Sequence, residues 1–381
     1  MKCFVLYGVA LALLVPATAS GSGRLRDYGV SLGVMKTGRL NAITDVKGVR
    51  VGQVTLTDKP DMRTGVTAIV PVGKNIFANK VPAGVYVGNG FGKMAGISQV
   101  RELGNIETPI VLTNTLNVAE GIAGIVEYTL EQNGCSSVNA VVGETNDGGL
   151  NNIRARYVSK ENVKDAIRNA KDGPVEEGCV GAGTGTKAFG YKAGIGTASR
   201  VLPASMGGYT VGVLVQANFG GVLQIAGVPI GQLLGKYEFR DRIMQDVDGS
   251  CMIVVITDAP VNSRNLERMA KRAMLGLAQT GGIASNGSGD YAIALSVAEE
   301  NLITGQGERY ESSVLKDDDM SGLFLAAIEA TSEAIWNALF AAEDMTGYKG
   351  RTVKAIDKEK AAKLILKAQK ATGLQSEDTI K

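Results

Sequence analysis

Hydrophobic residues along this chain follow two periods that alternate without a regular order. Short apolar or alternating runs predict strands at 64–71, 84–88, 209–217, 251–257 and 291–297, and a hairpin across 40–57 around a Lys47-Gly48 turn. Apolar positions three and four apart predict helices at 120–132, 162–170, 264–279, 322–342 and 357–372. No steady βαβ alternation, repeat or linker interrupts this mixture. The pattern therefore predicts a single α+β domain with helices packed on a layered sheet.

Residues 201–235 carry no charge and form a stretch long enough to suggest a membrane span. Polar residues such as Gln216 and Gln224 interrupt this stretch, and glycines and Pro229 recur through it. Residues 209–217 alternate as a buried strand does and end at a turn that begins with Asn218. We therefore expect two central strands of a covered sheet here, and no helix in lipid.

Composition excludes several kinds of chemistry. The chain has no histidine, which rules out Ser-His-Asp and Cys-His hydrolases, imidazole-ligated zinc and a histidine general base. A net charge of +2 gives no reason to expect nucleic acid or an anionic membrane as a partner. Glycine supplies 50 of 381 residues, about twice the usual share, which indicates tight turns and close backbone approaches. The spacing of Cys135, Cys179 and Cys251 predicts no disulfide framework, although it is compatible with a single bridge.

The first 19 residues have the pattern of an export signal. Lys2 precedes an apolar run at 3–15, and Ala17-Thr-Ala19 fits a small-residue cleavage site. The run is shorter than the ~20 residues that a membrane span needs, which disfavours the alternative of a retained anchor. We expect cleavage after Ala19, a mature chain that starts at Ser20 with no membrane partner, and a location in a periplasm or outside the cell.

The glycine-rich segment 181–187 is compatible with three interpretations. It meets neither the phosphate-loop pattern nor the dinucleotide-turn pattern, because Lys187 follows Thr186 and the glycine register is wrong. A turn that lets the backbone pass close to another element is the default interpretation. A third alternative is that its amides line a site for a negatively charged group.

A polar segment at 245–248 leads into Gly249-Ser250 and then into a buried strand. Without histidine, a serine nucleophile needs another base, and an α-amine of pKa ~7.7–8.0 is suitable near neutral pH. Breakage of the Gly249-Ser250 bond would place nucleophile and base on one residue, whereas the ordinary alternative is a simple turn. Cys251 would point to the opposite face of the strand from Ser250, and we expect it to pack in the core.

Five polar segments, taken together, resemble the DmpA-type family, which includes L-aminopeptidase/D-esterase and the β-peptidyl aminopeptidases. The resemblance runs from about residue 40 to the final helices, and its motifs are specific only as a set. This sequence departs from the family pattern at Gln53, where a histidine is frequent, and at Gly149, where an aromatic residue is frequent. The segments are 63–67, 112–115, 143–148, 215–220 and 285–291.

The resemblance implies a four-layer α/β/β/α sandwich, similar to DmpA and the ornithine acetyltransferases, in one domain. It implies a precursor that cuts itself between Gly249 and Ser250. The products would be an α chain of residues 20–249 and a β chain of residues 250–381, which stay associated as a heterodimer within a homotetramer. It implies no metal or other cofactor.

The resemblance also gives roles to individual residues. Ser250 would be the nucleophile, with Ser288 and Asp290 beside it to orient the serine and its amine. Asn218 would stabilise the oxyanion, and Glu144 would hold the ammonium group of the substrate. Each of the last two has an ordinary alternative, since Asn218 could cap a turn and Glu144 could pair with a surface lysine.

These residues predict an exported, self-processing serine aminopeptidase that acts on short peptides and amides with a free N-terminus. The N-terminal residue removed would be a β-amino acid, or an α residue of L or D configuration. One alternative is an acyltransferase of the ornithine-acetyltransferase type, against which the serine counts because those enzymes use threonine. Another is a non-catalytic periplasmic protein that binds amines or peptides.

Overall fold

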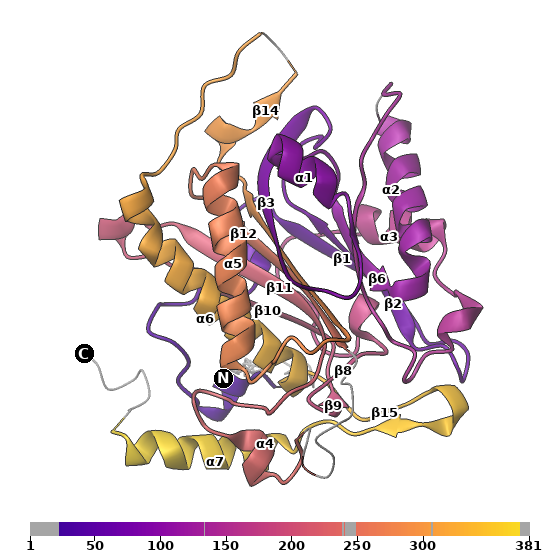
Figure 1. The fold of residues 1–381 in the computed structure, drawn as a ribbon, viewed down its shortest axis with the longest axis vertical. Helices are drawn as coiled ribbons and strands as arrows, with labels where there is room; N and C mark the ends of the chain where they lie inside the picture. The colour runs from indigo at the N-terminus through magenta and orange to yellow at the C-terminus, as the bar shows by residue number, and fades with distance from the viewer. Residues whose placement is uncertain (1–22, 133, 238–239, 241–248, 306–307, 374–381) are drawn as a thin grey trace, which may run out of the picture.

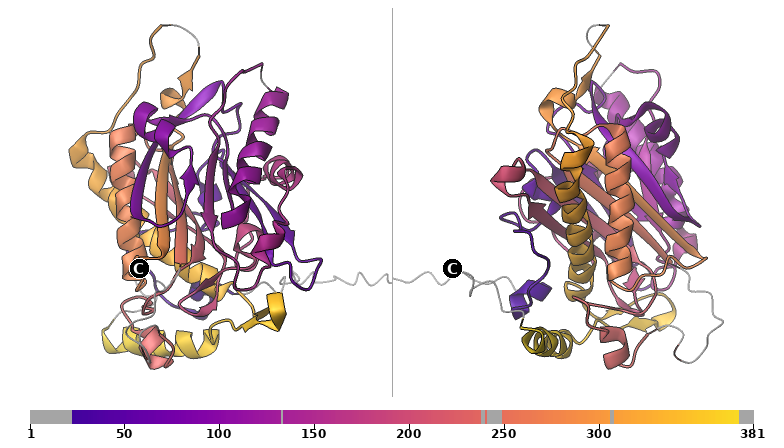
Figure 2. Two further views of the ribbon diagram at one scale, coloured as in Figure 1. Left: turned by 45° about the vertical axis from the view of Figure 1, so that its right-hand side comes forward. Right: turned by 60° about the vertical axis from the view of Figure 1, so that its left-hand side comes forward.

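A computed structural model describes residues 23–132, 134–237, 240, 249–305 and 308–373. Over these residues two β-sheets lie face to face between two layers of helices (Figures 1 and 2). The expected α+β sandwich is therefore confirmed. The proposed signal sequence at 1–19 and the polar segment at 245–248 lie outside the described residues.

The larger sheet has seven strands, and both sides of the Gly249-Ser250 bond contribute to it. β12 and β13 run parallel to each other, whereas β11 pairs with β12 and β3 pairs with β13 in antiparallel fashion. A short strand, β5 (Asn105–Ile106), also pairs with β3. The main order is β10 (Ile195–Val201), β11 (Thr210–Asn218), β12 (Gly249–Thr257), β13 (Ser288–Ser296), β3 (Asn79–Gly90) and β14 (Ile303–Thr304).

The smaller sheet has five strands and comes from the first half of the chain. β6 and β7 are parallel, and the other described pairs are antiparallel. Its order is β1 (Arg50–Leu56), β2 (Thr64–Val70), β6 (Ile110–Asn114), β7 (Val141–Thr145) and β4 (Met94–Ala95). Two further two-stranded ribbons are β8 (Lys187–Ala188) with β9 (Tyr191–Lys192) and β15 (Met345–Thr346) with β16 (Thr352–Val353).

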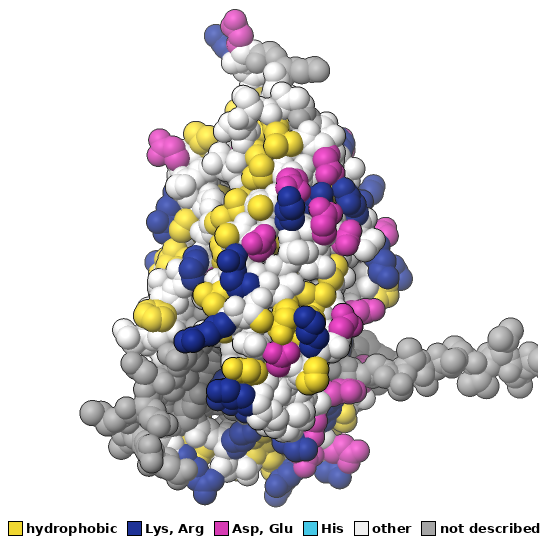
Figure 3. Space-filling view, turned by 90° about the vertical axis from the view of Figure 1, so that its right-hand side faces the viewer, with side chains coloured by type: hydrophobic (Ala, Val, Ile, Leu, Met, Phe, Trp, Pro, Cys, Tyr) yellow, Lys and Arg dark blue, Asp and Glu magenta, His cyan; other side chains and the backbone are white. Residues whose placement is uncertain are grey.

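Helices cover the outer face of each sheet. α2 (Val118–Gln132) and α3 (Lys160–Arg168) lie on the smaller sheet, and α5 (Ser263–Gln279) and α6 (Ser321–Phe340) lie on the larger one (Figure 1). Acidic and basic side chains intermingle over the α2 and α3 side of the molecule, as a solvated helix face requires (Figure 3). The remaining helices are α1 (Ile97–Leu103), α4 (Ile230–Leu233) and α7 (Lys358–Ala371).

β12 explains why the central strands are continuously apolar in sequence. All of its residues are buried. Cys251 and Val255 pack in the core between the larger sheet and its helices, whereas Met252 and Val254 pack in the core between the two sheets. A strand covered on both faces needs apolar residues at every position. The expected burial of Cys251 is confirmed, and the described cysteines are free thiols.

All five predicted helices are present as α2, α3, α5, α6 and α7, with ends within two residues of those expected. The predicted strands other than the hairpin are β2, β3, β11, β12 and β13. In the described chain, residues 317–340 form one helical segment that is long and apolar enough to cross a membrane, but 83% of its apolar window is buried inside the protein. It is therefore the core helix of the larger sheet's outer layer.

The predicted hairpin across 40–57 is wrong. Only its second half is a strand, β1, and that strand pairs with β2. The first half contains a 3-10 turn at Ile43–Asp45, because the Asp45 carboxylate accepts hydrogen bonds from the backbone N–H groups of Leu40 and Ala42. The turn at Gly48 does exist, with a φ of 89°.

The prediction of two strands within 201–235 is also wrong, because β11 is the one complete strand described there. After Asn218 the chain turns at Gly221 and Gly227, both with positive φ, and continues into α4. The N–H groups of Val222 and Gln224 bond to the turn that comes after α5. These backbone N–H groups therefore have hydrogen-bond partners without forming a second strand.

Candidate active site

A cavity of about 560 Å³ opens where strands of both sheets end near Ser250. β7 of the smaller sheet contributes Glu144, and β11 and β12 of the larger sheet contribute Asn218 and Ser250. Three residues that are far apart in the sequence, each predicted for the site, therefore share one cavity. Its full lining is Gly90, Phe91, Gly92, Lys93, Thr115, Glu144, Asn146, Gly149, Lys187, Asn218, Gly249, Ser250 and Gly287.

Ser250 is the second residue of β12 and is buried against its neighbours. Its Oγ donates a hydrogen bond to the carbonyl oxygen of Gly249, 2.5 Å away, so hydroxyl and scissile peptide lie together. Gly249 is required by close packing, since a Cβ there would lie 2.8 Å from the Cα of Phe219. The reason for glycine is therefore the close approach of the backbone at the end of β11.

Asn218 is the last residue of β11, and it lies opposite Ser250 in the antiparallel register. Its Oδ1 accepts a hydrogen bond from the backbone N–H of Lys187 at 3.2 Å, and its Nδ2 donates to the carbonyl oxygen of Asn146 at 3.0 Å. These two bonds fix the orientation of the amide and use one of its two N–H groups. Asn218 therefore joins two other segments instead of capping its own turn.

Glu144 is almost fully buried, with 2% of its side chain exposed. Its Oε1 accepts hydrogen bonds from the backbone N–H and from the ammonium of Lys93, both at 3.1 Å. Its Oε2 accepts a hydrogen bond from the hydroxyl of Thr115. The alternative of a lysine partner is thus what the structure shows, and the same contact demonstrates that this carboxylate can hold a primary ammonium.

Ser288 and Asp290 lie on β13, next to β12, where Ser288 pairs with Gly249. The Ser288 hydroxyl donates to Asp290 Oδ1 at 2.9 Å, and the buried Asp290 Oδ2 has no hydrogen-bond partner among the described residues. Burial raises the pKa of Asp290 to about 6. Neither side chain lines the cavity. Both residues lie on the strand beside the one that carries Ser250.

Several cavity residues had no role in the sequence-based prediction. Thr115 and Asn146 belong to family-like segments that were recognised without a role for these positions, and Lys187 ends the glycine-rich segment. Phe91 and Lys93 lie in the loop after β3 and carry no pattern that could have identified them.

The two departures from the family pattern fall in different places. Gly149 lines the cavity, and a Cβ added there would meet nothing within 4 Å, so its lack of a side chain leaves open space. Gln53 does not line the cavity. Its side chain bonds instead to the carbonyl of Glu176 and to the hydroxyl of Thr67.

The glycine-rich segment 181–187 is a turn that packs tightly, as the default interpretation states. A Cβ on Gly183 would lie 2.3 Å from the backbone nitrogen of Ile195. The N–H groups of Gly181 and Ala182 donate to threonine hydroxyls, so they are not open to an anionic ligand. The anion-site alternative is therefore wrong for these two amides.

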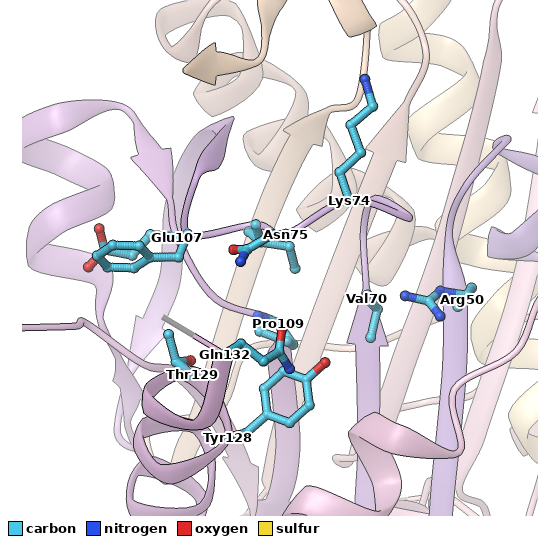
Figure 4. Close-up of a pocket in the computed structure, with 11 residues that line it drawn as sticks. Arg50, Val70, Lys74, Asn75, Glu107, Pro109, Tyr128, Thr129 and Gln132 are labelled. Atoms are coloured by element: carbon cyan, nitrogen blue, oxygen red, sulfur yellow. The ribbon is translucent and has the colours of Figure 1, made fainter. Parts of the chain in front are cut away.

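A second cavity lies between β1 and α2, and Figure 4 shows Arg50 and Tyr128 at its wall. Its volume of about 30 Å³ is close to the space of a single water molecule. It is too small for a peptide.

Known proteins share the sequence pattern and the fold of this chain. Residues 41–353 match the model of peptidase family S58. The chain is 40% identical over 370 residues to the β-peptidyl aminopeptidase BapA of Sphingosinicella microcystinivorans, covering 91% of this chain and 93% of that protein.

Two solved structures are similar over nearly their whole length. The β-aminopeptidase of Burkholderia sp. has a TM-score of 0.83 and 38% identity, with 92% of this chain and 99% of that chain covered. The L-aminopeptidase D-Ala-esterase/amidase of Ochrobactrum anthropi has a TM-score of 0.82 and 35% identity, with 91% and 99% covered. The second is described as a prototype of the serine aminopeptidases and a variant of the N-terminal-nucleophile hydrolase fold.

Fold and comparisons together define a self-processing serine aminopeptidase of the N-terminal-nucleophile class. The chain belongs to peptidase family S58. Neither the acyltransferase nor the non-catalytic binding protein finds support among these relatives.

Proposed function

We propose that this protein is a β-aminopeptidase that matures by cutting its own Gly249-Ser250 bond. The observation that supports this most directly is the shared cavity of Ser250, Asn218 and Glu144. It combines a hydroxyl nucleophile, an amide donor and a buried carboxylate within a site that has no imidazole. The names of the relatives support a β-amino acid as the residue removed.

Self-cleavage starts from the contact between the Ser250 hydroxyl and the Gly249 carbonyl group. Oγ attacks the carbonyl carbon, the C–N bond breaks, and the nitrogen takes a proton to become the amine of Ser250. The resulting ester is hydrolysed by water, which leaves the carboxylate of Gly249 and the free hydroxyl of Ser250. One bond has then been cut at the expense of one water molecule.

Peptide hydrolysis repeats this chemistry on a bound substrate. The amine of Ser250 accepts the proton of its own hydroxyl while Oγ attacks the substrate carbonyl. The Nδ2 of Asn218 donates to the oxyanion, and water then hydrolyses the acyl-enzyme. Asp290, oriented by Ser288, has a buried oxygen without a partner in the described part of the chain, and this oxygen can accept a hydrogen bond from the new amine.

Recognition of the free N-terminus belongs to Glu144. Its buried carboxylate accepts two neutral donors and already holds the Lys93 ammonium, so it can hold the ammonium of a substrate in the same way. Substrates are therefore short peptides or amides whose N-terminal amine is free. The open space beside Gly149 adds room for the substrate in the same cavity.

The mature enzyme in this proposal is periplasmic or secreted, and it starts at Ser20 after removal of the segment 1–19. Its processed chains, 20–249 and 250–381, form heterodimers that assemble into a tetramer. The export pattern of the first 19 residues and the family resemblance support these statements.

The test compares wild-type protein with Ser250→Ala and Cys251→Ala variants by intact mass and by hydrolysis of a β-alanyl amide. Wild type and Cys251→Ala are expected to be cut between residues 249 and 250 and to release β-alanine. Ser250→Ala is expected to stay in one piece and to be inactive. An uncut but active wild type, or a cut and active Ser250→Ala protein, would contradict the nucleophile assignment.

A further inference from the structure

The carboxylate that binds the substrate's amine in the proposed function already holds an amine of the protein. Lys93 approaches Glu144 Oε1 with both its backbone N–H and its ammonium, each at 3.1 Å. The Thr115 hydroxyl satisfies Oε2. All three residues line the cavity that contains Ser250. The pocket therefore contains a cation of the protein where the substrate's cation has to bind.

The two partners of this ion pair differ in their access to water. The Glu144 side chain is 2% exposed, whereas the Lys93 side chain is 51% exposed. A buried carboxylate without a counter-ion is strongly disfavoured, so Glu144 needs a cation at all times. Lys93 can return its ammonium to water at little cost, because a half-exposed lysine gains little from an ion pair.

We propose that Lys93 is an exchangeable counter-ion: it neutralises Glu144 in the empty pocket and leaves when the ammonium of a substrate arrives. The exchange replaces one charge by another, so the buried carboxylate is never left alone. The Lys93 N–H and the Thr115 hydroxyl stay in place as the remaining donors. This inference depends on the proposed role of Glu144.

The exchange also supplies a reason for selectivity. A ligand with a primary ammonium can replace the Lys93 ammonium on Glu144, and in doing so it opens the part of the cavity that the lysine side chain fills. An N-acylated ligand has no charge to offer, so the Lys93–Glu144 pair stays closed against it. Lys93 is thus a specificity-determining residue for primary ammonium ligands.

Binding of β-alanine amide to the uncut Ser250→Ala protein, measured by calorimetry, tests this without any turnover. Adding Lys93→Met, which keeps the length of the side chain and removes its charge, is expected to tighten binding about two- to fivefold, the range that half-exposed ion pairs span. Lys93→Arg is the matched control and is expected to bind as the Ser250→Ala parent does. N-acetyl-β-alanine amide is expected not to bind to the parent or to Lys93→Arg, in which the ion pair with Glu144 stays closed.

In the processed enzyme, Lys93→Met is expected to lower KM for β-alanyl amides by the same factor and to leave kcat unchanged. Equal or weaker binding by Lys93→Met would overturn the exchange. Glu144→Gln separates this failure from failure of the proposed function. If Glu144→Gln abolishes binding while Lys93→Met changes nothing, the anchor stands and only the exchange is wrong, whereas retained binding in Glu144→Gln rejects the anchor itself.

Discussion

Asp147 is a buried acid next to Asn146, whose carbonyl oxygen accepts the hydrogen bond from Asn218. It accepts a hydrogen bond from Asn151, but burial dominates and raises its pKa to about 7. Between pH about 4 and 7 the folded state therefore holds a proton that the unfolded state has lost. The free energy of unfolding falls as pH rises through this window. Above pH 7 the buried carboxyl is ionised and the full loss of stability is present.

Asp147→Asn should remove this dependence. The measurement is urea unfolding from pH 4.5 to 7.5 in the uncut Ser250→Ala background. Compared with this parent, the free energy of unfolding of Asp147→Asn should fall less steeply with pH, by up to about 1.4 kcal/mol per pH unit. The exposed Asp172 provides the matched control, since Asp172→Asn should keep the slope of the parent. Equal slopes for parent and Asp147→Asn would contradict a folded-state pKa near 7.

Helices approach the sheets most closely at glycines, which explains much of the high glycine content. A Cβ on Gly196 of β10 would lie 1.9 Å from the carbonyl oxygen of Ala334 in α6. Similar approaches occur between Gly52 and α3 and between Gly84 and α5. Glycine at these strand positions permits helix backbone to touch sheet backbone.

Gly196→Ala should therefore destabilise the protein by about 1–3 kcal/mol, since α6 must move away from β10 to admit one methyl group. Thermal or urea unfolding measures the loss. Gly73→Ala is the control, because a Cβ there meets nothing within 4 Å, and it should leave stability unchanged within about 0.5 kcal/mol. Similar stabilities for the two variants would show that α6 accommodates the methyl group without strain.

Elements with strong local patterns could be predicted from the sequence, and non-local pairings could not. α5 is predictable from its apolar spacing, and β12 is predictable from its β-branched run between polar segments. The partner of β1 is another strand, β2, and nothing in the pattern around Gly48 distinguishes a strand from the Asp45 turn that precedes it. Hydrogen bonds between the Asp45 side chain and the backbone determine the structure of that region, and hydrophobic periodicity does not reveal such bonds.

The candidate active site was predictable only where family-like segments marked it. Glu144, Asn218 and Ser250 were predicted in this way, and the packing of one sheet on the other brings them to one cavity. Lys93 could not be identified, because an isolated lysine in a loop resembles any solvated residue. Its importance depends on a contact between the loop after β3 and a strand of the other sheet, and only the folded structure shows this contact.

The whole molecule determines whether the two products of the proposed self-cleavage would stay together, because they are interleaved within one sheet. β12 and β13 of the proposed chain 250–381 lie between β11 and β3 of the proposed chain 20–249, and α5 and α6 of the second chain cover strands of both. Charged contacts add to this, since Glu333 of the second chain pairs with Arg26 and Arg200 of the first. Separation would therefore expose the core of the protein.

We expect the cut protein to elute from a size-exclusion column as one species that contains both chains, at the volume of uncut Ser250→Ala. The chains should separate only in denaturant, because their interface is continuous β-sheet with helices packed over it. Mass spectrometry of the native peak should find both products in equal amounts. Loss of the chain 250–381 from that peak without denaturant would mean that strand pairing and helix packing do not hold the halves together.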